Sequence, residues 1–231
     1  HVRNIYALVR VADEIVDGPA HDAGLSPERE RAVLDGLENE VRDAIATGFS
    51  ANLVVHAFAR TARECGITEE LIAPFFASMR TDLDTAEHDD ISHDAYVYGS
   101  AEVVGLMCLQ VFLNAGMSAP ARPAADLVDG ARRLGAAFQD VNFLRDLADD
   151  ADRLGRDYLD GAADDERRTA VLDRIDADLA AAASVIPHLP PDCRAAVTTA
   201  HDLFAELSRR LRSSPAAAPR VRVPDGVKAT L

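Results

Sequence analysis

The chain has 231 residues, of which 48% are hydrophobic and 27% charged, a balance typical of a folded globular protein. Its 39 acidic residues outnumber its 24 lysines and arginines, and the net charge of −15 excludes non-specific binding to nucleic acid. The three cysteines, Cys65, Cys108 and Cys193, show no CxxC or Cys/His spacing. This argues against a disulfide framework and a structural zinc site, and favours a cytoplasmic protein.

Apolar residues recur at helical spacing along almost the whole chain, so the predicted fold class is all-α. Ser26 before Pro27 is typical of a helix start, and Gly66 is typical of a helix end. The expected helices are 2–16, 27–46, 52–65, 68–81, 96–115, 124–152, 164–186 and 192–211. The connections are short and no internal repeat is present, so residues 1–231 are expected to form one domain.

Two further features of the chain limit what it is expected to be. No uninterrupted apolar run reaches the roughly 18 residues of a membrane-spanning helix. The chain begins at His1 inside an apolar-periodic segment, so an N-terminal segment is expected to be missing. His88 and His93 lie in an acidic stretch between two apolar helices, which predicts a solvated loop there and not a metal site.

Asp13 and Asp17 form the first of two acidic clusters. They are four residues apart in an apolar helix, so they share one helix face with Cβ atoms about 6 Å apart. Arg10 lies three residues before Asp13 on the same face, and Tyr6 lies one turn further back. Glu14 is predicted to point away from this face.

The second acidic cluster lies in the long helix 124–152. Asn142, Asp146 and Asp150 step by four residues and place a stripe of oxygen ligands along one face. Gln139 extends the stripe, and Arg145 lies beside it.

Oxygen ligands without histidine favour a hard cation such as Mg²⁺, with Mn²⁺ as the alternative ion. Arginines beside the carboxylates are suited to clamp a diphosphate, whose other oxygens the metal would bridge. Either cluster alone is more often a solvated helix face. The two together, each with an arginine at a helical offset, favour a site for metal and diphosphate.

The first cluster, with the residues from Tyr6 to Asp17, resembles the first aspartate-rich motif of the squalene and phytoene synthase family. The segment from Gln139 to Asp150, continuing through Arg153-Leu154-Gly155-Arg156-Asp157-Tyr158-Leu159, resembles the second. The segment 96–107 is similar to the family's central cavity helix, and its Ser100-Ala101-Glu102 most resembles the bacterial phytoene synthases. The segment 220–224, with Lys228, is similar to the family's basic C-terminal segment.

The resemblance implies an isoprenoid-synthase helical bundle around a central apolar cavity, and a Mg²⁺-dependent prenyltransferase that joins two prenyl diphosphates head to head. Two geranylgeranyl diphosphates would give phytoene through a cyclopropylcarbinyl diphosphate. The catalytic residues it implies are Tyr6, Arg10, Asp13, Asp17, Asp146 and Asp150. The metal ligands it implies are Asp13, Asp17, Asn142, Asp146 and Asp150. The substrate-binding residues it implies are Arg10, Tyr96, Gln139, Asn142, Arg145, Arg156 and Tyr158.

Three departures and two alternative functions accompany this interpretation. Glu14 stands where many members have Asp, Asp160 where Pro is common, and Phe204 near a common Tyr. The alternatives are a synthase of squalene or dehydrosqualene that uses farnesyl diphosphate, and a non-catalytic assembly factor with the same fold. For Arg220, Arg222 and Lys228, diphosphate binding and a frayed basic tail are equally open. The apolar product predicts peripheral membrane contact, and the sequence does not indicate the oligomeric state.

Overall fold

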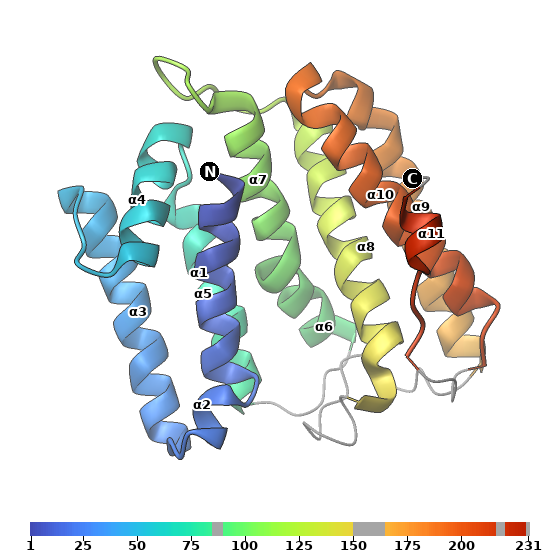
Figure 1. Ribbon diagram of the computed structural model, residues 1–231, viewed down its shortest axis with the longest axis horizontal. Helices are drawn as coiled ribbons and strands as arrows, with labels where there is room; N and C mark the ends of the chain where they lie inside the picture. Colours follow the sequence, from blue (N-terminus) through green and yellow to red (C-terminus); the bar gives the residue numbers. More distant parts are fainter. Residues whose placement is uncertain (85–89, 150–164, 216–219, 230–231) are drawn as a thin grey trace. The chain divides into compact units, whose positions relative to one another are not determined.

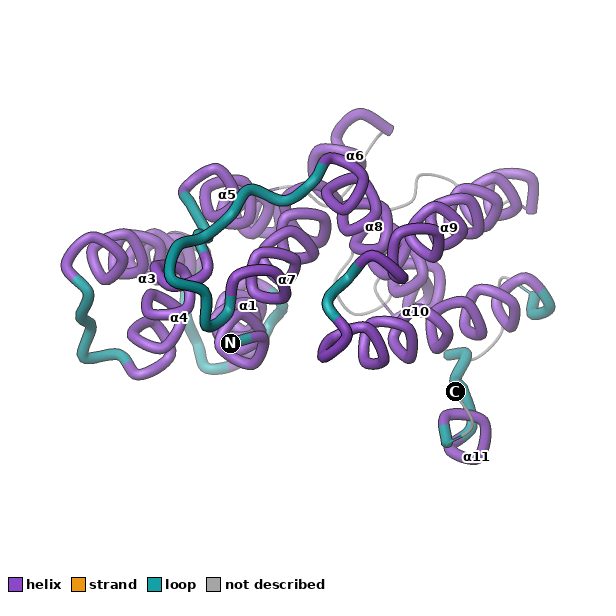
Figure 2. Tube along the Cα trace, turned by 90° about the horizontal axis from the view of Figure 1, so that it is seen from above, coloured by secondary structure: helices purple, strands orange, loops and turns teal. Residues whose placement is uncertain are grey.

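The computed structural model describes residues 1–84, 90–149, 165–215 and 220–229, with the backbone alone for residues 90–92 and 147–149. All regular elements in these ranges are helical, which confirms the all-α prediction (Figure 1 and Figure 2). The chain divides into two compact units, each built from separate segments. Unit 1 comprises residues 1–85 and 98–123, and unit 2 comprises residues 86–97 and 124–231. The single domain over residues 1–231 and its central apolar cavity stay predictions.

Unit 1 is built around helix α1, which contacts α3, α4, α5 and α7. The helices of this unit are α1 (Val2–Val16), α2 (Pro19–Asp22), α3 (Pro27–Thr47), α4 (Leu53–Cys65), α5 (Glu69–Asp84), the π-helix η1 (Tyr98–Glu102) and α7 (Val103–Asn114). Their apolar faces meet in a core that includes the fully buried Phe58, Phe75 and Met107. Burial of such side chains contributes about 1.5–3 kcal/mol each.

Capping groups set the predicted boundaries in this unit. The Ser26 hydroxyl accepts a hydrogen bond from the backbone N–H of Arg29 at 3.4 Å, and Pro27 opens α3. The Asn52 side chain accepts from the N–H of Val54 at 3.1 Å at the start of α4. Gly66 ends α4 in the left-handed conformation, with φ of 77°. Local side-chain chemistry therefore positions α3 and α4 as the sequence predicts.

The π-helix η1 begins at the residue after α6 ends, and it packs closely on α5. A Cβ atom on Gly99 would clash with the Pro74 carbonyl oxygen and the Ser78 hydroxyl. Pro74 lies inside α5, and a proline there interrupts the regular hydrogen-bond ladder of a helix. In place of the predicted single helix over residues 96–115, the structure has the end of α6, the π-helix η1 and α7 in succession.

We expect Gly99→Ala to lower the free energy of unfolding by about 3 kcal/mol, because the added methyl group has no space. The matched variant is Gly36→Ala in the exposed middle of α3, where a Cβ meets no atom within 4 Å. That change is expected to raise the free energy of unfolding by about 0.5–1 kcal/mol. Urea unfolding of both variants measures the difference. Equal stability of the two would contradict the close packing of η1 on α5.

Unit 2 contains α8, α9 and α10 side by side, with α6 adding to its core (Figure 1). Its helices are α6 (Asp90–Val97), α8 (Ala125–Asp149), α9 (Asp165–Val185), the 3-10 helix η3 (Ile186–His188), α10 (Pro191–Arg212) and α11 (Asp225–Lys228). Tyr96, Val141 and Ile175 are buried in its core. The prediction of a solvated loop at His93 is wrong: His93 lies in α6 and is 5% exposed. His88 lies outside the described residues.

One continuous helical stretch in the described part of the chain, His93–Asn114, is long and apolar enough by length and composition to cross a membrane. The sequence contains no uninterrupted apolar run of that length, since Asp94 and Glu102 fall within it. A core helix meets the same criteria, and Val103 and Met107 in this stretch are fully buried in the core of unit 1. Of the most apolar 18-residue window in this stretch, 39% is buried.

Candidate active site

Asp13 and Asp17 lie at the C-terminal end of α1, and both side chains are half-buried. The pKa of Asp13 is raised to about 7, mainly by burial and next by the neighbouring Asp17 carboxylate. Asp82, a buried residue of α5, also acts to raise it, whereas Arg10 acts to lower it. Negative charge on Asp13 is therefore costly until a cation compensates it.

Arg10 and Tyr6 lie on α1 before this pair. The guanidinium of Arg10 forms an ion pair with Glu14, one turn further along the helix. The sequence analysis gave Glu14 no role, and the structure pairs it with the arginine that is predicted to bind diphosphate. The side chain of Tyr6 is exposed. Its predicted place at the reaction centre stays a prediction.

Gln139, Asn142 and Asp146 lie in the C-terminal half of α8, each half-buried. Arg145 donates to both carboxylate oxygens of Asp146, from Nε at 3.0 Å and from Nη2 at 2.6 Å. Arg220 contacts the same two oxygens, with Nε at 2.7 Å and Nη2 at 3.1 Å. Two arginines far apart in the sequence therefore meet on one predicted metal ligand.

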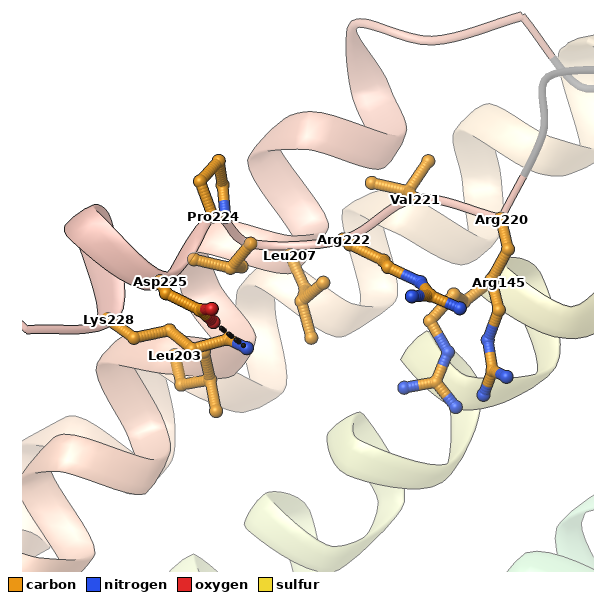
Figure 3. A pocket seen from close by; sticks show the side chains of 10 residues that line it. Arg145, Leu203, Leu207, Arg220, Val221, Arg222, Pro224, Asp225 and Lys228 are labelled. Atoms are coloured by element: carbon orange, nitrogen blue, oxygen red, sulfur yellow. Dashed lines mark hydrogen bonds and ion pairs between the residues drawn. The ribbon is translucent and has the colours of Figure 1, made fainter.

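The C-terminal segment forms a basic pocket with α8 and α10. Val223 is buried in the core of unit 2 and anchors the segment. The pocket has a volume of about 540 Å³, and Leu203 and Leu207 of α10 line its apolar side. Arg145, Arg220 and Arg222 gather at one side of it, and Lys228 lies at the other (Figure 3). The interpretation of these basic residues as a frayed tail is wrong, because Val223 is buried and Arg220 is paired with Asp146, whereas their binding of diphosphate stays a prediction.

The cations in this pocket differ in how they are neutralised. Lys228 forms an ion pair with Asp225 at 2.9 Å, and Arg220 is paired with Asp146. The Arg222 guanidinium has no hydrogen bond or ion pair with any residue that the structure describes. A pocket with four cations, one of them without a charged partner among the described residues, is suited to a polyanion such as a diphosphate.

The donor chemistry of the predicted metal ligands fits a hard divalent cation. Two carboxylates on α1 and an amide and a carboxylate on α8 supply oxygen atoms only. The raised pKa of Asp13 reflects its burial first and the nearby Asp17 carboxylate second, a cost that a bound cation offsets. Within the described ranges, no three His, Cys, Asp or Glu side chains gather into a metal-binding group. Asp150, Arg156 and Tyr158, which complete the predicted set, lie outside the described residues.

Tyr96 of α6 is 6% exposed, and its ring lies 6.1 Å from that of Phe143 on α8. The structure therefore places Tyr96, a predicted substrate contact, in the core of unit 2. Its neighbour Phe143 directly follows Asn142 on α8 and lies four residues after Gln139. Three polar residues around it, His93, Asp140 and Arg174, were not among the predicted site residues. Asp140, within the second acidic motif itself, was the signal that could have indicated them.

Comparison with known proteins identifies the family. The sequence model of the squalene/phytoene synthase family matches residues 1–162. A phytoene synthase of Mycobacterium tuberculosis (strain ATCC 25618 / H37Rv) is 30% identical over 234 residues, covering 92% of this chain and 72% of that protein. A 15-cis-phytoene synthase of Paracoccus sp. (strain N81106 / MBIC 01143) is 28% identical over 241 residues, covering 95% and 75%.

Two solved structures confirm the predicted fold. A dehydrosqualene synthase in complex with ligand aligns with a TM-score of 0.80 at 22% identity, covering 99% of this chain and 82% of that one. A squalene synthase from Alicyclobacillus acidocaldarius aligns with a TM-score of 0.78 at 19% identity, covering 95% and 86%. The chain therefore belongs to the squalene/phytoene synthase family, and it is a prenyltransferase of the type that condenses prenyl diphosphates head to head.

Proposed function

We propose that the protein condenses two molecules of geranylgeranyl diphosphate to phytoene through a cyclopropylcarbinyl diphosphate, prephytoene diphosphate. The observation that carries the proposal is the basic pocket beside Asp146, together with relatives that are named phytoene synthases. The family is a divalent-metal-dependent type of prenyltransferase, and the assignment of Mg²⁺, with Mn²⁺ as the alternative, is part of the proposal.

The residues of the chain have distinct tasks in this reaction. When bound, a divalent cation draws charge from the diphosphate oxygens and makes the diphosphate a better leaving group. In unit 1, Asp13 and Asp17 are proposed as ligands of a divalent cation, and in unit 2 a separate set of proposed ligands is Asn142, Asp146 and Asp150. Arg145, Arg220 and Arg222 hold the diphosphate. Their bidentate guanidinium geometry matches its oxygens, and the diphosphate stays bound as the allylic carbon loses it.

The contacts of Asp146 suggest an exchange when substrate arrives. Arg145 and Arg220 both occupy its carboxylate oxygens, at 2.6–3.1 Å. A diphosphate offers these guanidiniums more negative charge than one carboxylate does. Binding of the diphosphate would draw the two arginines away and free Asp146 for a cation. Tyr96, with its aromatic face, is proposed to stabilise the carbocation that follows, as Tyr6 is. Gln139 is proposed to orient the substrate beside it.

A product assay tests the proposed function. The purified protein is incubated with geranylgeranyl or farnesyl diphosphate, each with Mg²⁺ or Mn²⁺, and the hydrocarbon extract is analysed by mass. A C40 triene from geranylgeranyl diphosphate is the expected result. A C30 product from farnesyl diphosphate alone would show the alternative, a synthase of squalene or dehydrosqualene. No product from either substrate with either ion would contradict the proposal. The second alternative, an assembly factor without catalysis, does not agree with membership of a family of prenyltransferases.

Arg222 allows a specific test of the diphosphate pocket. We expect Arg222→Met to raise KM for the prenyl diphosphate about tenfold, since one charge-assisted hydrogen bond contributes about 1.5–3 kcal/mol. The value of kcat should change less than about threefold, because Arg145 and Arg220 remain to hold the leaving group. The matched control is Arg209→Met on α10, an exposed arginine that pairs with Glu206 and does not line the pocket. An unchanged KM in Arg222→Met would contradict the role of the pocket.

Peripheral membrane contact for release of the apolar product, and a cytoplasmic location, stay predictions. Vesicle flotation with and without substrate tests the first of them. The oligomeric state is a separate question for measurement.

A further inference from the structure

A buried polar network joins three helices of unit 2, and none of its three residues was among the predicted site residues. His93 of α6 and Asp140 of α8 are 5% and 2% exposed, and Arg174 of α9 is half-exposed. His93 Nε2 lies 3.0 Å from Asp140 Oδ1. The Nε and Nη2 atoms of Arg174 lie 3.1 and 2.9 Å from Asp140 Oδ2. One carboxylate thus connects α6 and α9 to α8.

The chemistry of the carboxylate decides the direction of these hydrogen bonds. A carboxylate only accepts, so His93 donates from a protonated Nε2 and Arg174 donates from its two nitrogens. Arg174 Nη2 also lies 3.2 Å from His93 Nε2. With its proton directed to Asp140, Nε2 has no lone pair for this arginine. Both donors therefore converge on Asp140, which fixes the plane of the imidazole.

The same helix faces carry a predicted substrate contact. His93 and Tyr96 are three residues apart on α6, and Asp140 and Phe143 are three residues apart on α8. The rings of His93 and Tyr96 lie 5.9 and 6.1 Å from the ring of Phe143. The polar network and the Tyr96 ring are thus two parts of one contact between α6 and α8. Movement of His93 away from α8 would move Tyr96 with it.

We propose that Asp140, with His93 and Arg174, is a positioning residue that holds the Tyr96 ring in place for the condensation. The inference rests on the proposed function of the site. A purely structural role explains the network less well. The surrounding core is apolar, and a buried ion pair contributes little stability compared with apolar residues of similar size. What the network supplies is a directional contact, which fixes the rotation of α6 against α8 in a way that apolar packing does not.

The first test compares two variants of the network. The double variant His93→Leu/Asp140→Leu removes both buried polar groups together, so that neither is left without a partner, and half-exposed Arg174 can turn to water. We expect kcat to fall about 10- to 100-fold, since displacement of a reacting group by about 1 Å has an effect of this size, with KM within about threefold. His93→Gln keeps a donor that can reach Asp140 and should retain at least about half of kcat. His201→Gln on α10 is the matched control and should leave kcat unchanged.

The second test asks whether the network acts through Tyr96. Arg174→Gln removes one arm of the network at a half-exposed position, so it should fold even if the double variant does not. We expect it to lower kcat about three- to tenfold. In a Tyr96→Ala background the same change should have almost no effect, because the ring it positions is gone. Near-ultraviolet circular dichroism gives a reading independent of activity. The chain has four tyrosines and no tryptophan, so loss of order at Tyr96 should reduce the tyrosine signal.

The outcomes separate this inference from the proposed function. A folded double variant with wild-type kcat would overturn the positioning role, as would an Arg174→Gln effect of equal size with and without Tyr96. A fall in kcat that only follows a smaller folded fraction would also overturn it. If the unaltered protein forms no head-to-head product, the proposed function fails. The circular dichroism comparison still reports whether the network orders Tyr96.

Discussion

Replacing Asp146 by asparagine is expected to lower kcat/KM by at least about 1000-fold, which corresponds to about 4 kcal/mol of lost transition-state stabilisation. The change keeps the size of the side chain and removes its charge. It therefore weakens a proposed cation ligand and removes the negative charge that Arg145 and Arg220 share. The fold should persist, because the side chain lies at the edge of the pocket and not in the apolar core. Steady-state product formation with Mg²⁺ measures the effect.

The same variant separates loss of catalysis from loss of diphosphate binding. Without metal, inorganic diphosphate should bind Asp146→Asn at least as tightly as the unaltered protein, because Arg145 and Arg220 no longer have a competing carboxylate. Isothermal titration calorimetry measures this binding. Asp129→Asn is the control on the same helix, an exposed residue paired with Arg133. Turnover within about tenfold of the unaltered protein in Asp146→Asn would rule out the metal assignment.

Asp13→Asn is expected to abolish turnover and, at the same time, to stabilise the metal-free protein. The pKa of Asp13 is raised from 3.8 to about 7 in the folded chain. Between these values the folded state binds more protons at Asp13 than the unfolded state does, so stability falls as pH rises through this range. Above pH 7 the ionised side chain lowers the free energy of unfolding by a few kcal/mol at most, since each unit by which the pKa is raised corresponds to about 1.4 kcal/mol. Asparagine removes this cost.

Urea unfolding from pH 4 to pH 8 without metal measures the effect. The stability gained in Asp13→Asn should be close to zero near pH 4 and should reach its full size near pH 8. Asp43→Asn, at an exposed position on α3, should show no such dependence on pH. Saturating Mg²⁺ and diphosphate should stabilise the unaltered protein and not the variant. If Asp13→Asn is less stable than the unaltered protein at pH 8, this contradicts the raised pKa of Asp13, which burial and the Asp17 carboxylate cause.

Local signals made much of this fold predictable. Ser26, Asn52 and Gly66 determine helix ends by contacts within a few residues, so the sequence alone indicates them. The spacing of Asn142 and Asp146 within an apolar-periodic segment likewise predicts a stripe of ligands on one helix. The resemblance of both acidic motifs to one family then indicated the reaction, which helical periodicity cannot indicate.

Non-local contacts account for what the sequence did not predict. His93 is surrounded by acidic residues in the sequence, which is typical of a solvated loop, yet its partner Asp140 lies 47 residues further along the chain. Arg220 meets Asp146 across 74 residues, so only the folded chain shows that the basic tail belongs to the pocket. Val221 and Val223, the apolar residues that alternate with arginines in this segment, were the sequence signal for its anchoring. The ion pair between Arg10 and Glu14 depends on side-chain geometry, which residue spacing does not determine.

The interleaved course of the chain through its two units has a consequence for its synthesis. Residues 86–97 of unit 2 leave the ribosome before residues 98–123 complete unit 1. His93 of α6 can form its contacts only after Asp140, 47 residues later, and Arg174, 81 residues later, have been synthesised. At about 5–20 residues per second, these delays amount to roughly 2–9 s and 4–16 s. During that interval Tyr96 and Val97 lack their core partners, so the nascent chain presents an unfinished apolar surface that chaperones of the ribosome exit can recognise.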